Sequence, residues 1–109
     1  MKDHRLIDER SLAFGKLIAD KVRADPTLTQ HARDNLERWM RDCSERLRPA
    51  LLEWEEVLNG PLPELLNFQV SRDERATRLR QSSPFAGVIT SEERWEVLRD
   101  FQARDEAAA

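Results

Sequence analysis

The sequence predicts an all-α protein, a small bundle of about five to six helices with an irregular, uncharged loop before the last helix. Composition is the first reason: Gly occurs three times, Pro five times and Tyr not at all, while the helix formers Ala, Leu, Glu and Arg dominate. Spacing is the second, because apolar residues recur every three or four positions. Length is the third, since 109 residues suit one domain, residues 1–109, and leave no room for two.

Three helices are expected in the first half of the chain. The first covers residues 5–24, where the apolar positions keep helical spacing as far as an Asp-Pro pair. Asp25 can cap a second helix, residues 26–43, with a proline in its first turn. A third covers residues 48–59 and ends where Gly60 can adopt a positive φ. The second helix carries a narrow apolar seam that can pack antiparallel to a neighbouring helix or close a homodimer, made of Leu28, Ala32, Leu36, Trp39 and Cys43.

The second half of the chain predicts shorter elements. Residues 63–70 form a short helix after two prolines. Residues 71–81 begin with SRDE, which has the spacing of a capping box, and the same spacing in TSEE opens the last helix, residues 91–105. We expect that last helix to bury Trp95, Leu98 and Phe101.

The three tryptophans occupy apolar positions of their helices. Burial in the core is therefore expected for Trp39, Trp54 and Trp95. An exposed tryptophan would instead mark a binding surface, because exposed aromatic side chains are enriched at the energetic centres of interfaces.

The segment between the last two helices, residues 82–90, lies in the longest stretch without a charged side chain, QSSPFAGVITS. This is unusual in a chain of which 36% is Asp, Glu, Lys or Arg. Pro84 disfavours helix at the residue before it, so the segment should be irregular and extended. Either Phe85, Val88 and Ile89 pack into the protein's own core or they are presented to a partner, and the sequence leaves both open.

Charge and cysteine content limit the compartment and the partners. The formal net charge is −3, so the summed field does not draw the protein toward nucleic acid. The single Cys43 suits a reducing compartment, the charged opening MKDHRLIDER is unlike a secretory signal, and no apolar run approaches the length of a membrane span. We expect a soluble, cytoplasmic protein.

Catalytic and metal signatures are weak. Cys43 and His31 are twelve residues apart on one helix, which sets them roughly 120° apart around its axis, a poor geometry for proton transfer. Glu53, Glu55 and Glu56 can form a metal or acid/base cluster, or simply a solvated helix face. We expect no enzymatic activity, no cofactor and no metal.

The predicted helix 71–81 carries four arginines. In one interpretation they contact phosphate, and the helix, the loop and the last helix form an atypical helix-turn-helix of a DNA-binding regulator. The long connection and the acidic last helix disfavour that interpretation. In the other, which we prefer, the helix is simply solvated or its arginines form an Arg-rich protein interface. The four are Arg72, Arg75, Arg78 and Arg80.

Two stretches resemble a set of short bacterial proteins, some of them encoded beside toxins of toxin–antitoxin modules. RLRQSSPFAGVITSEERWEVLR, residues 78–99, is similar to their C-terminal part, and SLAFGKLIADKVRADPTLTQHARDNLERW, residues 11–39, to their N-terminal part. The resemblance implies a small accessory or antitoxin-like protein, a class that commonly combines a folded body with a segment inserted into its toxin.

These observations predict a non-enzymatic protein-binding module, antitoxin-like, that occludes a co-encoded protein partner. A DNA-binding transcriptional regulator is the alternative. The uncharged segment would fill an apolar groove of the partner while neighbouring arginines pair with its carboxylates or block a phosphate site. On this hypothesis Phe85→Asp leaves the fold intact and abolishes binding. The expected partner-binding residues are Arg78, Arg80, Pro84, Phe85, Val88 and Ile89.

Overall fold

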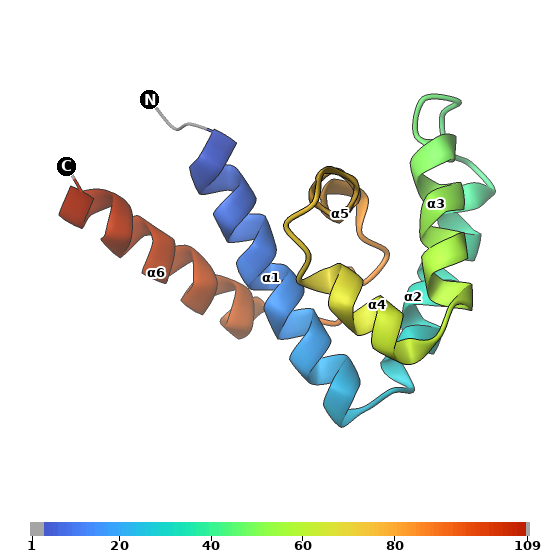
Figure 1. The fold of residues 1–109 in the computed structure, drawn as a ribbon, viewed down its shortest axis with the longest axis horizontal. Helices are drawn as coiled ribbons and strands as arrows, with labels where there is room; N and C mark the ends of the chain where they lie inside the picture. The colour runs from blue at the N-terminus through green and yellow to red at the C-terminus, as the bar shows by residue number, and fades with distance from the viewer. Residues whose placement is uncertain (1–3, 109) are drawn as a thin grey trace.

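The computed structural model describes residues 4–108 of the chain, and within that range the regular elements are all helices and there is no strand (Figure 1). The all-α prediction is confirmed. The elements are α1 (His4–Ala24), α2 (Leu28–Met40), α3 (Arg48–Asn59), α4 (Leu62–Gln69), α5 (Glu74–Leu79), the 3₁₀ helix η1 (Arg80–Ser82) and α6 (Ser91–Ala108). None of these helices is both long enough and apolar enough to cross a bilayer.

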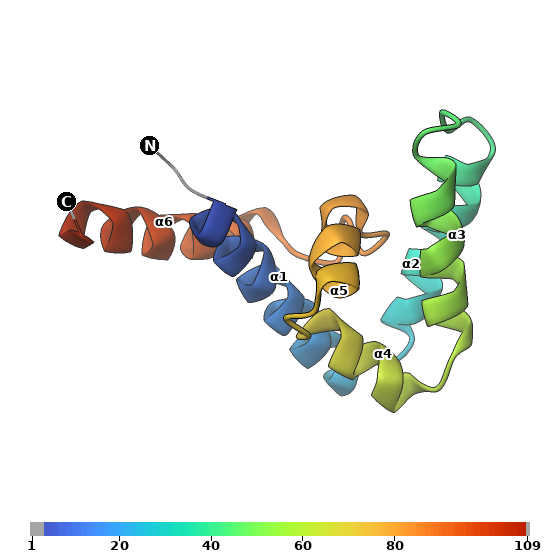
Figure 2. The ribbon, with the colours of Figure 1, turned by 45° about the horizontal axis from the view of Figure 1, so that its top comes forward.

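The helices form two groups that meet at the core. In both views α2 and α3 lie side by side as a hairpin, while α6 extends away from that hairpin (Figures 1 and 2). The long helix α1 packs chiefly against α4 and α6 and less extensively against α2. The predicted bundle is therefore present, but α1 joins the C-terminal helices more closely than it joins the α2–α3 hairpin.

Trp54 of α3 is the centre of the core. Its side chain is fully buried, and its indole N–H donates to the backbone carbonyl of Leu79 at 2.8 Å. The ring meets Phe68 and Phe85 edge to face, with centroid separations of 5.4 and 6.3 Å. Edge-to-face pairs place the positive ring edge against the negative ring face, which adds to the hydrophobic gain. One residue thus ties α3 to α4, to α5 and to the segment before α6.

The apolar seam of α2 faces this same core. Ala32 and Leu36 are buried, and Leu28, Trp39 and Cys43 are half-buried against the core cluster. The α2–α3 hairpin thereby uses the seam within one chain, as the antiparallel alternative predicted.

The ends of α6 and α5 show where the capping predictions succeed and where they differ. At α6, Thr90 and Glu93 bond reciprocally: the Glu93 carboxylate accepts from the Thr90 N–H at 2.8 Å, and the Thr90 hydroxyl accepts from the Glu93 N–H at 3.1 Å. At α5 the cap is Asp73 instead of Ser71, because the Asp73 carboxylate accepts from the Ala76 N–H at 2.7 Å. The helix expected over residues 71–81 is therefore shorter, and η1 follows it.

Two glycines also differ from expectation. Gly60 ends α3 with φ −81° and ψ 178°, an extended conformation, so the positive φ expected there is absent. Gly87 has the positive φ instead, at 89°. The helix expected over 26–43 spans 28–40. At its start Asp25 accepts from the Thr27 N–H within the preceding turn and does not cap the helix, and at its end residues 41 and 42 form a turn. The bounds 48–59 are confirmed.

Candidate functional site

The uncharged segment folds inward. Phe85 is 1% exposed and Val88 6%, Pro84 is buried, and Ile89 is half-buried against the core. The choice that the sequence left open is thus decided by packing: the apolar side chains close the space between α1, α2 and α3 in place of a partner.

Two polar side chains of α2 hold the segment in place. The buried Asn35 donates from Nδ2 to the carbonyls of Pro84 and Ala86, both at 2.9 Å. His31 Nε2 lies 3.0 Å from the same Ala86 oxygen. Gly87 is required beside them, because its φ is positive and a Cβ there would lie 3.0 Å from His31 Nε2.

The expectation that Pro84, Phe85 and Val88 are offered to a partner is corrected by this packing. Their side chains fill the core and are not available at the surface. Phe85→Asp would bury a carboxylate among apolar side chains, so it tests folding and not recognition. Ile89 keeps partial exposure beside them.

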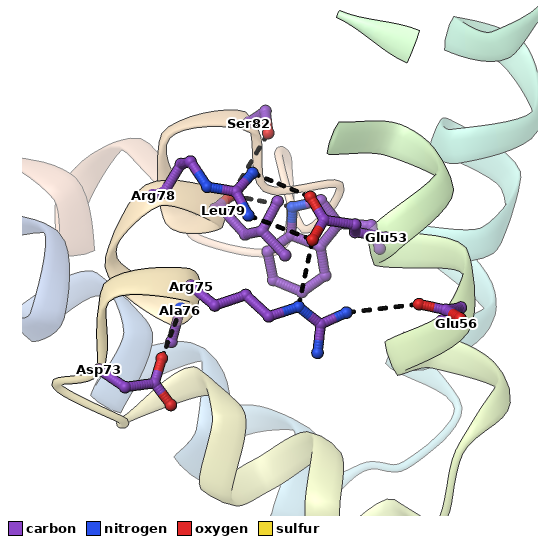
Figure 3. A network of polar contacts seen from close by, with 9 residues as sticks. Glu53, Glu56, Asp73, Arg75, Ala76, Arg78, Leu79 and Ser82 are labelled. Atoms are coloured by element: carbon purple, nitrogen blue, oxygen red, sulfur yellow. Dashed lines mark hydrogen bonds and ion pairs between the residues drawn. The ribbon is translucent and has the colours of Figure 1, made fainter. Parts of the chain in front are cut away.

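Arg78 of α5 is bonded to α3. Its two terminal nitrogens donate to Glu53 at 2.9 and 3.1 Å, and Arg75 donates to Glu53 at 3.2 Å and to Glu56 at 3.4 Å (Figure 3). The Arg78 hydrogen bond is the largest cause that lowers the pKa of Glu53 below its ordinary value. A carboxylate held ionised in this way is a poor proton donor at neutral pH.

The remaining arginines of this region are also engaged within the chain. Arg72 pairs with Glu9 of α1, and Arg80 donates to the Ser71 carbonyl at 2.7 Å. The helix between them has only six residues. This arrangement gives the DNA-binding alternative no free row of guanidinium groups on α5.

The other candidate catalytic and metal-ligating residues lie apart from one another. Across residues 4–108 there is no group of three or more His, Cys, Asp or Glu side chains placed to hold a metal ion. The half-buried Cys43 lies near the Met40 carbonyl, with its sulfur 3.9 Å from the oxygen, whereas His31 faces Ala86. Glu55 is exposed.

Three of the predicted site residues come together around a cavity of about 300 Å³. Arg80, Phe85 and Ile89 line it with residues of α1, the end of α4 and the start of α6. Arg78, Pro84 and Val88 do not line this cavity.

Trp95 is the clearest departure from the sequence prediction. It is 62% exposed, the highest value among the large apolar residues described as exposed, so its predicted burial is wrong. The face of α6 that packs on α1 carries the buried Phe101 and the half-buried Val97. At about 100° per residue, Trp95 lies roughly 120° from Phe101 around the axis and so points away from α1.

The charges of α6 divide between these two faces. Toward α1, Glu93 accepts from Lys21 at 2.6 Å, and the guanidinium of Arg94 lies over the Phe14 ring at 5.4 Å. Around Trp95, a shallow hollow is lined by three charged side chains that have no ion pair with other described residues. They are Glu92, Glu96 and Arg99.

Two buried polar residues escaped the sequence prediction, Asn35 and Gln69. Each has a detectable signal, because each occurs where an apolar residue would continue a step of three or four: Asn35 follows Ala32, and Gln69 follows Leu65. A polar residue on an apolar face needs a partner, and Asn35 finds one in the segment 84–86.

Comparison of the chain with protein-family models, curated proteins and solved structures found no match. The resemblance to toxin-associated bacterial proteins therefore stays a prediction.

Proposed function

We propose that this chain is a non-enzymatic protein-binding module whose contact surface is centred on Trp95. The proposal depends above all on the 62% exposure of that side chain. A tryptophan buries a large apolar area in a partner at a small cost in side-chain entropy, and for that reason it is enriched among the residues that dominate binding energy. We call the four residues that define this surface, Glu92, Trp95, Glu96 and Arg99, the Trp95 surface.

The chemistry of the Trp95 surface favours one kind of partner. Its two carboxylates are unpaired within the described residues, and one arginine balances only one of them. A complementary protein would offer an apolar pocket for the indole with lysine or arginine beside it. Such a pocket is expected on a basic protein, which would also be steered toward an acidic helix over a long range.

This surface replaces the uncharged segment in the expected antitoxin-like mechanism. The segment is needed inside the core, whereas α6 extends from the body and can enter a groove without unfolding (Figure 2). The partner is then a co-encoded protein, in this hypothesis a toxin, whose functional surface α6 occludes.

The test is Trp95→Ala in the full chain, co-expressed with the product of the adjacent gene. We expect at least about 30-fold weaker binding, the effect of losing a residue worth about 2 kcal/mol at an interface. Leu52→Ala is the matched control, because Leu52 is 46% exposed on α3 and lies outside the Trp95 surface. Both variants should melt within a few degrees of the parent protein, since neither side chain is buried.

Two outcomes would contradict the proposal. Equal binding by the parent and Trp95→Ala would remove the Trp95 surface from the interface. A concentration-dependent dimer in sedimentation, lost in Trp95→Ala and kept in Leu52→Ala, would show instead that this surface joins two copies of the chain.

A further inference from the structure

A second feature of the molecule is independent of α6's outer face: the cavity of about 300 Å³ between α1, the end of α4, η1 and the segment after it. The cavity is partly open to solvent. Gly15 of α1 brings its walls together. A Cβ at Gly15 would lie 2.1 Å from the Gln69 carbonyl oxygen and 3.1 Å from Arg80 Cδ, so these three residues converge at one point.

The charge of this cavity is opposite to that of the chain. The whole sequence has 21 acidic and 18 basic residues, yet the lining contains Arg10, Arg80 and Arg94 and no carboxylate. Arg10 has no ion pair with a described residue, and the Arg94 guanidinium packs on the Phe14 ring. The Arg80 guanidinium already donates to the Ser71 carbonyl at 2.7 Å and to the Thr77 hydroxyl at 3.3 Å. Arg10 and Arg94 have no side-chain hydrogen bond or ion pair with a described residue, and their positive charges favour an anion in the cavity.

Polar atoms without a hydrogen-bond partner are a second, separate indication that the cavity holds a ligand. Three buried side-chain atoms lack a partner within the described part of the chain: Oε1 and Nε2 of Gln69 and Nε of Arg80. Gln69 is only 1% exposed, so its amide has lost water without gaining a bond. Both residues line the cavity. Buried polar groups are nearly always satisfied in proteins, and exceptions therefore indicate a missing partner such as a ligand.

The remaining walls combine apolar side chains with the polar side chains of Ser11, Gln81 and Ser83. The apolar lining residues are Phe14, Ile18, Phe85 and Ile89. A volume near 300 Å³ is at the lower limit of ordinary ligand sites, which suits a molecule with one ring and excludes one as large as a dinucleotide.

We propose that this cavity binds a small organic anion, with a phosphate or carboxylate headgroup held by Arg10, Arg80 and Arg94 and an apolar body against Phe14 and Ile89. The Gln69 amide atoms are inaccessible to solvent, so the side chain would turn toward the cavity before its amide donates to the headgroup and accepts from a hydroxyl of the same ligand. Burial is the largest cause that lowers the pKa of Arg80. An anion beside this guanidinium would offset that desolvation and strengthen its own binding.

Phenyl phosphate is the probe, and two-dimensional ¹H–¹⁵N NMR of the full chain is the measurement. We expect saturable shifts of the Gly15 and Gln69 amides, together with weaker binding at high salt. Phenol lacks the phosphate headgroup and inorganic phosphate lacks the apolar ring, so both should bind at least about tenfold more weakly than phenyl phosphate. Benzoate has a carboxylate in place of the phosphate, and its affinity relative to phenyl phosphate identifies the preferred headgroup.

The variants locate the site. Arg10→Gln and Arg94→Gln should each weaken phenyl phosphate binding about tenfold. Arg48→Gln is the matched control: it removes the same charge from an exposed position on α3 and should leave the affinity unchanged. Gln69→Met keeps the length of the side chain and removes its unpartnered polar atoms. We expect this variant to melt at a higher temperature than the parent while binding phenyl phosphate more weakly, a combination that a purely structural glutamine would not give.

Three results would overturn the proposal: no shift at Gly15 and Gln69 with phenyl phosphate, binding of inorganic phosphate as strong as that of phenyl phosphate, or an equal loss of affinity in Arg48→Gln and Arg94→Gln. None of them depends on the Trp95 surface, so this site and the proposed protein interface can fail separately.

Discussion

Phe85 and Trp95 show at the scale of single residues how the surroundings decide what an apolar side chain does. Phe85 lies in an uncharged segment and is 1% exposed, whereas Trp95 lies in a helix with apolar spacing and is 62% exposed. Burial depends on whether a second element covers the position. The core covers Phe85 through Trp54, and nothing in the described chain covers Trp95.

Phe85→Ala should therefore destabilise the protein strongly. Removing a buried phenyl ring loses its transfer free energy and leaves a cavity, which together cost about 3–5 kcal/mol. Urea denaturation followed by tryptophan fluorescence, with the buried Trp54 as a reporter of the core, would measure the loss of stability. A change below about 1 kcal/mol would contradict the inward packing, because exposed side chains rarely contribute more.

At the scale of elements, the ends of the helices depend on a few side-chain bonds. Asp73 caps α5, and its hydrogen bond from the Ala76 N–H is the largest cause that lowers the pKa of this carboxyl below 3.8 (Figure 3). A group whose pKa is lowered by folding adds stability above its unfolded value. That contribution is lost as the pH falls from about 4 through the lower folded value.

Asp73→Ala should lower the melting temperature at pH 7 by roughly 5 °C, the usual effect of losing an N-terminal cap in a domain of this size. Asp73→Asn is the control, because Asn also caps helices but carries no titrating group. The difference in melting temperature between the parent and Asp73→Asn should shrink as the pH falls below 3.8. A difference that stays constant down to pH 2 would show that the charge of Asp73 contributes nothing to folding.

At the scale of the whole molecule, the shape follows from which helices lie at the edge. The radius of gyration is 14.4 Å, compared with about 13 Å for a typical compact chain of this length. The α2–α3 hairpin and α6 project in different directions from the centre (Figure 1). The close packing of α1 on α4 holds the centre together, and Gly15 permits it.

Gly15→Ala tests that central contact. Alanine favours the helix by about 1 kcal/mol, but its Cβ would lie 2.1 Å from the Gln69 backbone oxygen, so α1 and α4 would have to move apart. We expect the clash to prevail, with a net loss of about 2 kcal/mol in the free energy of unfolding. Gly60→Ala is the control, because a Cβ there meets nothing nearer than the Val57 oxygen at 3.4 Å and φ is negative. Equal effects of the two substitutions would contradict the close contact of α1 and α4.

The sequence by itself determined the helices and much of their ends. Periodic apolar positions and capping residues act within a few residues of each other, so 48–59 and the Thr90–Glu93 cap were predictable. Local rules also placed Trp54 in the core.

Only the tertiary structure decided which face of each helix is covered and where the uncharged segment goes. Periodicity around Trp95 describes one helix, whereas its exposure depends on α1, some 80 residues earlier in the chain. The cavity likewise joins Arg10 to Arg80 and Arg94, which are far apart in sequence. Local spacing carries no information on such distant neighbours, because burial and electrostatic interaction depend on distance in space.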